Sequence, residues 1–292
     1  MLTDGESAVL IRTLSPSDGA AAHELARAEG WNQTAEDWGR VQRLSPDGCF
    51  GAYAAETLVG TVTTVTYGGS LAWLGMMVVN AAYRGRGVGR RLMEAALTHC
   101  TACGVETVKL DATPAGKPLY ESLGFAVETT VERWEGIARP TGAPEQGIRS
   151  PGPPRLDELV ALDRQAFGAD RRSLVEELIA QRACEAAAIR FSTSDRVPTG
   201  YALARRGRRA AYVGPLMAAD RATARTLLDD LFVRLEGRAL FLDWMAGPHG
   251  APDFLLARGW KMQRSLARMA RGRPSGAGLS PRTFAIAGPE LG

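Results

Sequence analysis

A glycine-rich turn at residues 84–90, with the sequence RGRGVGR, has the residue types of an anion-binding site. It follows an apolar stretch at 71–79 and opens a predicted helix over 88–102. Three glycines allow a tight turn whose backbone amides face one point. The free N–H groups of a helix N-terminus and three arginines add positive charge. Together, the glycine amides, the helix N-terminus and the arginines suit binding of a pyrophosphate. The alternative is a strand–helix turn that needs the same glycines and binds no ligand.

Two common phosphate motifs do not fit this turn. A Walker A loop needs a Gly-Lys-Ser/Thr ending, and no such string occurs in the chain. A dinucleotide fingerprint needs a glycine at its sixth position, which is Arg90 when the pattern starts at Gly85. The pattern that remains is Arg-x-x-Gly-x-Gly at 84–89.

A second motif, LYESLGF at 119–125, lies downstream. Thr113 and Pro114 predict a helix start before it, with threonine as N-cap and proline at the first helical position. Gly124 predicts the helix end. With the two motifs in this order and at this separation, residues 8–135 resemble the GNAT superfamily of acyl-CoA-dependent N-acetyltransferases.

The resemblance implies a cofactor cleft beside the strand 71–79. In that family the strand separates from its neighbour, and the pantetheine arm of acetyl-CoA lies in the gap. The amide of Val79 would then polarise the thioester carbonyl. Tyr120 would donate a proton to the departing thiolate, unless it only packs at a helix end. The implied cofactor contacts are Met77, Val78, Val79, Arg84, Gly85, Arg86, Gly87, Val88, Gly89, Arg90 and Thr113.

The chain departs from the family pattern at two places. Many members carry asparagine seven residues before the tyrosine, where this chain has Thr113. The strand 71–79 contains no Asp or Glu, so the general base is unassigned. Asp111 is a candidate that could equally pair with an arginine, and a water chain could also carry the proton. His23, His99 and His249 lie outside the motifs and are interpreted as surface or structural residues.

The acceptor side of the site is less defined. Trp31 and Asn32 lie between the first two predicted helices, a region that forms the acceptor wall in the resembling family. An aromatic and an amide side chain suit a polar amine. The same segment leads into a near capping box, Thr34 with Asp37, so a helix cap is an equally good interpretation.

Hydrophobic periodicity predicts a mixed α/β fold with two similar halves. Residues 139–154 are rich in proline and glycine and are predicted to be a linker. The expected domains are a catalytic GNAT domain at 1–138 and a GNAT-like domain at 155–292. The predicted strands are 8–13, 50–56, 58–67, 71–79, 105–111, 125–134, 185–192, 199–206, 209–217, 238–245, 260–271 and 282–288, and the predicted helices 17–29 (capped by Ser17), 88–102, 114–122, 155–167, 171–181, 220–236 and 250–258.

The second half repeats the element order without the chemistry. After the strand 209–217 there is no glycine turn, and Asp220 at a helix start would repel pyrophosphate. The tyrosine position is a leucine within 255–260. This half resembles the second domain of bacterial tandem-GNAT proteins, with the fold kept and the cofactor site lost. Phe167, Arg171 and Asp243 are its candidate substrate-binding residues, or else a core aromatic and ion-pair residues.

Composition excludes several protein classes. The 292 residues are 45% hydrophobic and 23% charged with a net charge of +3, which argues against wholesale disorder and coiled coils. Cys100 and Cys103 form one C-x-x-C pair without further ligands, so no metal is expected. The first 30 residues hold no continuous apolar run, and no segment reaches about 18 apolar residues. A cytoplasmic monomer or homodimer without a membrane partner is expected.

The predicted function is transfer of an acetyl group from acetyl-CoA to a primary amine of a small molecule, by direct attack in a ternary complex. The alternatives are a non-catalytic acyl-CoA-binding or regulatory protein and a protein or peptide acetyltransferase. Residues 141–292 hold 23 basic and 16 acidic residues, which raises nucleic-acid binding as a third possibility. Their densest cluster, 205–209, is predicted to be an exposed hairpin turn, so no nucleic-acid partner is expected.

Overall fold

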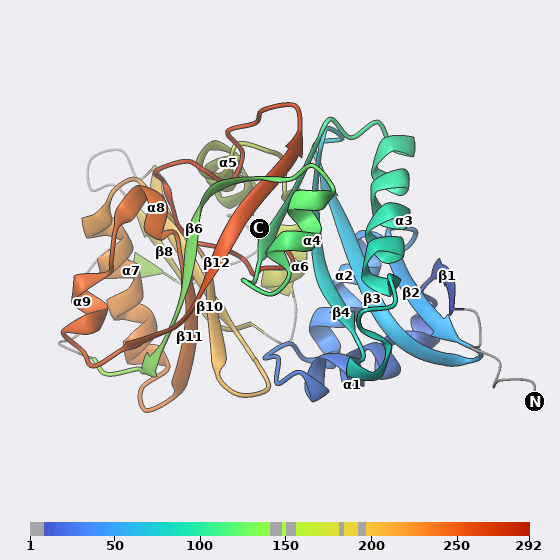
Figure 1. Ribbon diagram of the computed structural model, residues 1–292. Coiled ribbons are helices and arrows are strands. Elements are labelled where there is room, and N and C mark those ends of the chain that lie inside the picture. Colours follow the sequence, from blue (N-terminus) through green and yellow to red (C-terminus); the bar gives the residue numbers. More distant parts are fainter. Residues whose placement is uncertain (1–8, 141–147, 150–155, 181–183, 192–196) are drawn as a thin grey trace, which may run out of the picture. The chain divides into compact units, whose positions relative to one another are not determined.

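The computed structural model describes residues 9–140, 148–149, 156–180, 184–191 and 197–292 (Figure 1). The chain divides into two compact units, Met1–Val108 and Lys109–Gly292. Both are built from mostly antiparallel strands flanked by helices, which confirms the predicted fold class. Most of the predicted linker, 141–147 and 150–154, lies outside the described residues. The domain bounds expected from the sequence therefore stay predictions.

The first unit is a four-stranded antiparallel sheet with helices on both faces. Strands β1 to β4 pair in chain order. Figure 1 shows α3 on one face of this sheet and α1 and α2 on the other. The elements are β1 (Val9–Thr13), η1 (Pro16–Asp18), α1 (Gly19–Ala28), α2 (Ala35–Leu44), β2 (Cys49–Ala54), β3 (Thr57–Tyr67), β4 (Leu71–Val79), η2 (Ala81–Tyr83) and α3 (Val88–Ala102), followed by β5 (Thr107–Ala112), which runs into the second unit.

Capping side chains determine where the first helices begin. The helix predicted over 17–29 with Ser17 as its cap is α1, which begins at Gly19 with Asp18 at its N-cap position. Ser15 is the N-cap of the preceding η1, and its N–H donates to Asp18 Oδ2 at 2.8 Å. The capping box predicted at Thr34 is confirmed. The Thr34 N–H donates to Asp37 Oδ2 at 2.8 Å, and the Asp37 N–H donates back to Thr34 Oγ1 at 3.3 Å. Each box satisfies N–H groups that a helix start leaves free.

Strand β4 contains a bulge that the sequence did not reveal. Met76 has φ of +47°, which is rare for a residue with a side chain. The register with β3 shifts between Thr61 and Thr63, and Thr61 Oγ1 donates to the Met76 carbonyl at 2.7 Å. A bulge of this kind bends the strand and changes the direction of the residues that follow. The bend therefore orients Met77, Val78 and Val79.

The second unit is an eight-stranded sheet in the order β12-β6-β11-β13-β10-β9-β8-β7. Helix α7 contacts β8, β9 and β10, and its apolar residues join the main core with Trp134, Trp244 and Trp260. The elements are α4 (Lys117–Ser122), β6 (Ala126–Ile137), β7 (Ile148–Arg149), α5 (Leu156–Phe167), α6 (Arg172–Ala180), β8 (Cys184–Phe191), β9 (Pro198–Arg205), β10 (Ala211–Ala218), α7 (Arg221–Arg234), β11 (Ala239–Trp244), α8 (Ala246–His249), α9 (Asp253–Leu256), β12 (Lys261–Gly272) and β13 (Thr283–Ala285).

Strand β6 pairs on both sides with strands from the C-terminal part of the chain. It is antiparallel to β12, from Ala126 opposite Ala270 to Glu135 opposite Lys261. It is also antiparallel to β11, from Glu132 opposite Trp244 to Ile137 opposite Ala239. The strand that follows the LYESLGF motif is thus inserted between the last long strands of the chain, a pairing that no local sequence pattern indicates.

Two predicted helices differ from the structure. The helix expected over 114–122 begins only at Lys117, because residues 113–116 form a turn in which the Gly116 N–H donates to the Thr113 carbonyl at 3.0 Å. The helix expected over 250–258 is replaced by the short helices α8 and α9. Gly250 at φ of +63° and Pro252 lie between them and interrupt the helical path. In the described part of the chain, no helix is long and apolar enough to cross a membrane.

Candidate functional site

The glycine turn of the first unit has the geometry that anion binding requires. Gly85 and Gly87 have φ of +73° and +75°, a region that favours glycine. Gly87 is the N-cap of α3, and a methyl group added at either glycine would meet no atom within 4 Å. Helix N-termini leave their first N–H groups without intrahelical acceptors. The space in front of the turn is therefore open, and backbone donors face it.

Arg84 connects the glycine turn to β4, the strand that precedes it. Its Nε donates to the Val79 carbonyl at 2.9 Å, and its terminal nitrogen pairs with Glu29 at 2.5 Å. The residue was predicted as a cofactor contact. These bonds give it a positioning role as well, since they connect the end of β4 to the first residue of the turn.

The other two arginines of the turn are exposed. The Arg86 guanidinium lies 5.6 Å from the centre of the Tyr83 ring, a cation–π distance. Arg90 is exposed on the first turn of α3. Val88 between them is buried, and it anchors the helix start to the sheet. The turn therefore combines a fixed backbone with charged side chains that can reach an anion in solvent.

The end of β4 presents a backbone amide away from β3. The Asn80 N–H donates to the Val59 carbonyl of β3 at 2.8 Å. Amides of successive strand residues point to opposite edges, so the Val79 N–H points to the other edge of β4. Val78 is buried, whereas Met77 and Val79 are partly exposed. This orientation is the one that the predicted role of the Val79 amide requires.

Tyr120 lies on α4 in the second unit and is nearly buried, with 9% of its surface exposed. Its ring packs edge-to-face on Phe125, with centroids 6.2 Å apart. Burial raises the pKa of the Tyr120 hydroxyl to about 12. The phenol is therefore protonated at neutral pH, as a proton donor must be.

Two residues near Tyr120 in the sequence have structural partners. Thr113 Oγ1 accepts from the Gly116 N–H at 3.2 Å and shapes the turn before α4. The Asp111 carboxylate accepts two hydrogen bonds from Arg268, both at 2.9 Å, and both side chains are fully buried. Asp111 is thus an ion-pair residue, the alternative that the sequence left open, and it is not placed to act as a general base.

The segment proposed for the acceptor follows α1 directly. The Trp31 N–H donates to the Ala26 carbonyl at 3.1 Å and ends the helix, after Gly30 at φ of +73°. Asn32 is buried and Trp31 is partly exposed. Arg40 forms a buried ion pair with Asp37 at 2.5 Å. The helix-cap interpretation is confirmed by these contacts, and the acceptor role stays a prediction.

In the second unit, the position that corresponds to the glycine turn is closed by a side chain. Asp220 caps α7, and its Oδ1 accepts from the Thr223 N–H at 2.7 Å. Because this carboxylate already takes an N–H group of the helix start, and because it is negative, an anion is disfavoured there.

Strand β13 occupies the gap between β10 and β11. These strands are parallel neighbours at their beginnings, where Ala211 lies opposite Leu240. Further along they separate, and β13 pairs with both, with Ala285 opposite Leu216 and Trp244. The Met245 N–H donates to the Phe284 carbonyl at 2.9 Å. The chain itself thus fills the place between the two strands that a cofactor arm would need.

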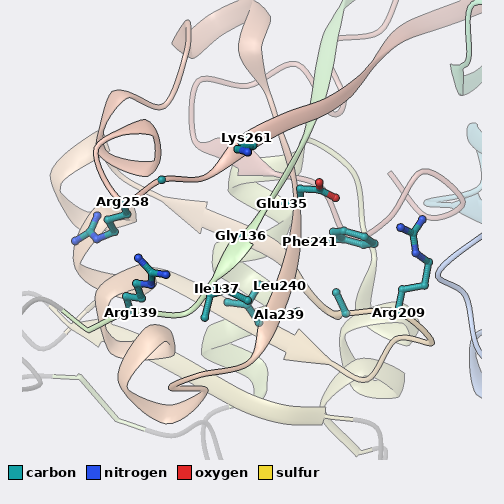
Figure 2. A pocket seen from close by; sticks show the side chains of 12 residues that line it. Glu135, Gly136, Ile137, Arg139, Arg209, Ala239, Leu240, Phe241, Arg258 and Lys261 are labelled. Carbon is teal, nitrogen blue, oxygen red and sulfur yellow. The ribbon is translucent and has the colours of Figure 1, made fainter.

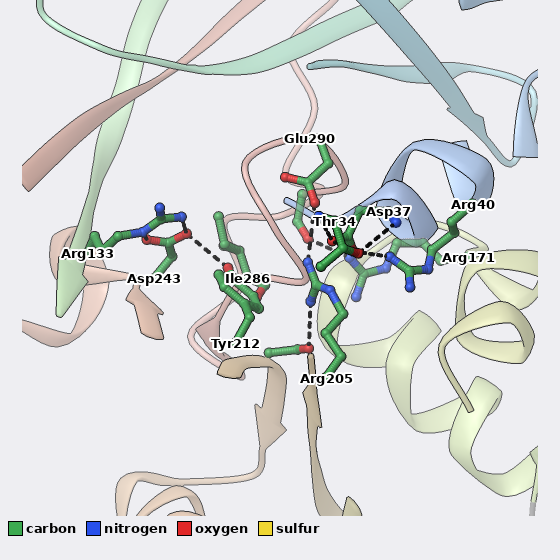
Figure 3. A network of polar contacts seen from close by, with 12 residues as sticks. Thr34, Asp37, Arg40, Arg133, Arg171, Arg205, Tyr212, Asp243, Ile286 and Glu290 are labelled. Carbon is green, nitrogen blue, oxygen red and sulfur yellow. Dashed lines mark hydrogen bonds and ion pairs between the residues drawn. The ribbon is translucent and has the colours of Figure 1, made fainter. Parts of the chain in front are cut away.

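The three candidate substrate residues of the second half have internal partners. Phe167 is fully buried, and the Arg171 guanidinium lies 3.7 Å from the centre of its ring. Arg171 also forms a bidentate ion pair with Asp163, with hydrogen bonds of 3.0 and 2.7 Å to the two carboxylate oxygens. Asp243 is fully buried and accepts from Arg133 at 2.8 and 2.6 Å (Figure 3). These contacts match the core-aromatic and ion-pair interpretation that the sequence left open.

The arginine cluster at 205–209 forms a hairpin turn, as predicted, but it is not wholly exposed. Arg205 is buried and pairs with Glu290 at 3.2 Å. Its guanidinium lies 4.2 Å from the centre of the Tyr212 ring. The other three arginines of the turn, Arg206, Arg208 and Arg209, are exposed to solvent. The cluster therefore supplies a buried structural charge as well as a surface patch.

The remaining candidate groups are structural. Burial raises the pKa of the Cys100 thiol to about 12, which disfavours a redox role, while Cys103 is exposed at the end of α3. His249 stacks on Phe284 at 3.9 Å. His99 packs edge-on against Phe50 at 5.8 Å. In the described ranges, no three His, Cys, Asp or Glu residues are placed to hold a metal ion.

A cavity of about 370 Å³ opens at the beginnings of β10, β11 and β12 (Figure 2). Ile137, Leu240 and Phe241 form its apolar part. Its charged lining consists of Glu135, Arg139, Arg209, Arg258 and Lys261. The gap filled by β13 lies toward the other ends of β10 and β11, so this cavity does not correspond to a cofactor cleft.

Two features of the site were missed by sequence reasoning. Nothing in the sequence predicts the bulge at Met76, because a methionine does not indicate a backbone with positive φ. The row of Arg264, Arg133 and Asp243 across three strands was missed because its members come from distant segments. Arginines at alternate, otherwise apolar strand positions were the signal that could have indicated buried charges.

Both halves of the chain match models of one family. Residues 17–125 match the model described as "Acetyltransferase (GNAT) family", and residues 159–283 match "Acetyltransferase (GNAT) domain". The chain is 27% identical over 155 residues to the holothin acyltransferase of a Pseudoalteromonas species, covering 53% of this chain and 52% of that protein. It is 28% identical over 171 residues to the uncharacterized N-acetyltransferase YitH of Bacillus subtilis, covering 58% and 59%.

The chain thus spans a little over half the length of these curated relatives. A crystal structure of a candidate acetyltransferase from Pyrococcus horikoshii matches with a TM-score of 0.82, covering 97% of this chain and 96% of that one. The identity is 23%, so this likeness shows the fold.

Proposed function

Because this chain is a tandem protein of the GNAT superfamily of acetyltransferases, we propose that its N-terminal domain transfers an acetyl group from acetyl-CoA to a primary amine of a small molecule. Acyl transfer in general follows from the family. We propose three further points: that acetyl-CoA is the acyl donor, that a small amine is the acceptor, and that the reaction occurs in a ternary complex. The glycine turn at the start of α3 is the observation that carries the proposal, since acetyl-CoA has a pyrophosphate and the turn offers open backbone donors to one.

The residues of β4 and of the turn have defined tasks in this proposal. The amides of residues 85–90 and the exposed arginines bind the pyrophosphate of acetyl-CoA. Met77 and Val78 contact the pantetheine arm. The Val79 N–H, which points away from β3, donates to the thioester carbonyl and stabilises the negative charge that develops there. Arg84 holds the Val79 carbonyl and so keeps that amide in position.

The chemical step is an attack by the amine nitrogen on the thioester carbon. The C–N bond forms, the C–S bond breaks, and the thiolate of CoA takes a proton from the Tyr120 hydroxyl. Burial keeps this phenol protonated, because its pKa is raised to about 12. The amine loses its proton to water, and water returns a proton to the Tyr120 oxygen, so that the tyrosine is restored for the next turnover. Asp111 has no part in this step, since Arg268 takes both of its oxygens.

The second domain binds no acetyl-CoA in this proposal. Asp220 closes the helix start where the pyrophosphate would bind, and β13 lies between β10 and β11 where the pantetheine would lie. Calorimetric titration of the full chain with CoA is expected to give one site per chain. A stoichiometry of two would contradict this assignment.

The test of the activity is CoA release from acetyl-CoA, followed with a thiol reagent, over a panel of primary amines, peptides and amino sugars. Turnover with small amines supports the proposal. Turnover confined to peptides assigns the enzyme to protein acetylation instead. Tight binding of CoA without turnover of any acceptor would overturn catalysis and leave the chain as an acyl-CoA-binding protein.

A further inference from the structure

The cavity of about 370 Å³ at the beginnings of β10, β11 and β12 has no part in the proposed acetyl transfer (Figure 2). All of its lining residues lie between Glu135 and Lys261, so the second unit forms it alone. Small-molecule sites have volumes of roughly 300–1,000 Å³. The cavity is therefore large enough for a small organic ligand.

The cavity is lined mainly from the face of the sheet opposite α7. Trp134 and Leu240 belong to the core that α7 helps to form. Because successive strand residues point to opposite faces, Glu135 and Phe241 point the other way, and they lie directly opposite each other. Lys261 lies opposite Glu135 on its other side. Three strands thus place a lysine, a glutamate and a phenylalanine in one row across the cavity.

The apolar part of the cavity includes a cross-strand pair. Ile137 of β6 lies opposite Ala239 of β11, and both are exposed. The exposed fraction of Ile137 is 41%, and Phe241 adds a ring to the same lining. A ligand with an apolar body would remove this surface from water, which favours binding.

Arg258 forms a fixed wall of the cavity. Its side chain is only 7% exposed and pairs with Asp229 at 2.5 Å. Its Nη1 donates to the Phe254 carbonyl at 3.1 Å, and its guanidinium lies 5.6 Å from the centre of the Phe232 ring. The charge of Arg258 is therefore balanced within the unit, and its position does not depend on a ligand.

The other charged lining residues leave an excess of positive charge. Arg139, Arg209 and Lys261 face one acidic residue, Glu135, whose Oε2 accepts from Gln263 at 2.8 Å. In formal charge, Glu135 offsets Arg209. Arg139 and Lys261 are exposed, and neither has an ion-pair partner in the part of the chain that the structure describes. The described lining therefore carries two positive charges in excess.

We propose that this cavity binds a small phosphate monoester, with the phosphate held by Arg139 and Lys261 and the organic group lying on Ile137 and Phe241. Figure 2 shows Arg139 and Lys261 on one side of Phe241 and Arg209 on the other. A phosphate monoester carries about two negative charges at neutral pH, so one group balances the excess, whereas a carboxylate balances half of it. A guanidinium binds two phosphate oxygens in parallel, and an ammonium adds a compact charge.

The ligand class is tested by calorimetric titration of the full chain with phenyl phosphate, inorganic phosphate and benzoate. Phenyl phosphate is expected to bind about tenfold more tightly than either of the others, because it alone combines a doubly charged group with a ring. Benzoate binding as tightly as phenyl phosphate would overturn the doubly charged ligand. Equal binding of inorganic phosphate would overturn the apolar contact, and no binding of phenyl phosphate at millimolar concentration would overturn the site.

Two variants test the cations of the cavity. Arg139→Met and Lys261→Met are each expected to raise the Kd for phenyl phosphate about tenfold, because each removes a charge-assisted contact. Both side chains are exposed, so Tm is expected to stay within about 2 °C of the wild type. Arg271→Met is the matched control. It removes an exposed arginine near the other end of β12 and is expected to change Kd less than about twofold. Equal effects of all three variants would indicate general attraction to a basic surface and contradict the site.

A further variant tests the apolar contact. Ile137→Thr keeps a β-branched side chain and removes part of the apolar surface. It is expected to raise the Kd for phenyl phosphate about threefold and to leave that for inorganic phosphate within about twofold. Equal changes for both probes would show that the organic group does not lie on Ile137.

The glycine turn of the first unit is the other place where a phosphate could bind, and Gly87→Ala separates the two sites. This variant is expected to leave the Kd for phenyl phosphate unchanged, because the cavity belongs to the second unit. Loss of binding in Gly87→Ala, with normal binding in Lys261→Met, would place the probe at the turn and overturn the inference. The result is independent of whether the chain acetylates any amine.

Discussion

Arg84 donates a hydrogen bond from Nε to the carbonyl oxygen of Val79, at 2.9 Å. The contact joins the end of β4 to the start of the glycine turn. The same guanidinium pairs with Glu29, the residue that follows α1. The end of β4, the glycine turn and the residue after α1 are thereby connected through one side chain. If this unit binds the cofactor as we propose, Arg84 is expected to contribute to binding through geometry as well as through charge.

Loss of the Arg84 contact should weaken cofactor binding. Arg84→Met removes the donor to Val79 and keeps most of the side-chain volume. One hydrogen bond of this kind contributes about 1 kcal/mol, so the Kd for CoA is expected to rise about 3- to 10-fold in calorimetric titration. Glu29→Gln is the control. It removes only an exposed ion pair and is expected to change Kd less than about twofold. Equal effects of the two variants would show that the bond to Val79 is not the cause.

Substitution of Gly87 should abolish CoA binding beyond its effect on stability. Gly87→Ala places a side chain at φ of +75° and in front of the turn. Gly104, just after α3, has φ of +73° and equally open surroundings, so Gly104→Ala is a matched control. Both are expected to lose roughly 1–2 kcal/mol of stability in urea unfolding. Only Gly87→Ala is expected to raise the Kd for CoA, by about tenfold or more. A similar Kd in both variants would remove the turn from the site.

Tyr120→Phe should slow the chemical step without changing cofactor binding. The phenylalanine ring keeps the packing on Phe125 and loses only the proton donor. A positioned general acid contributes about 100-fold or more, so kcat is expected to fall by that factor with KM for acetyl-CoA unchanged. Tyr83→Phe, before the glycine turn, is the control and should keep full activity. An unchanged kcat in Tyr120→Phe would exclude this tyrosine as the acid.

The pH profile should distinguish the tyrosine from the acceptor amine. The acid works when protonated, and the Tyr120 pKa is raised to about 12. Between pH 6 and about 10 it stays protonated, so it causes no loss of activity in that range. A rise in kcat/KM with pH is expected instead, because the acceptor attacks as a neutral amine. An alkaline fall near pH 8 that disappears in Tyr120→Phe would contradict the raised pKa.

The pair formed by Asp111 and Arg268 should be a major contributor to the stability of the second unit. Asp111→Ala leaves a fully buried guanidinium unpaired and is expected to cost about 3–5 kcal/mol in denaturant unfolding. Asp157→Ala removes the exposed partner of Arg172 and is expected to cost under about 0.5 kcal/mol. The double variant Asp111→Ala/Arg268→Met should recover part of the loss. A small effect of Asp111→Ala would mean that water reaches the pair.

Local signals were sufficient for most elements and for the glycine turn. The strand 71–79 and the helix 88–102 were predicted with the bounds that the structure has, because apolar runs and glycines act on the residues beside them. The capping box of Thr34 was predicted for the same reason. Errors arose where two local signals competed. Asp18 has the N-cap position of α1 in place of Ser17, and the turn at residues 113–116 delayed the start of α4.

Three features were determined by residues that lie close together in the sequence: the glycine turn, the capped helices and the absence of a matching turn in the second half. In each case the spacing of residues along a short segment sets the structure. Tertiary structure alone decided three features: the pairing of β6 with β11 and β12, the place of β13 between β10 and β11, and the partners of Asp111 and Asp243. Each joins segments far apart in sequence. Strand order and buried ion pairs depend on which surfaces meet in space, and no spacing within one segment records that meeting.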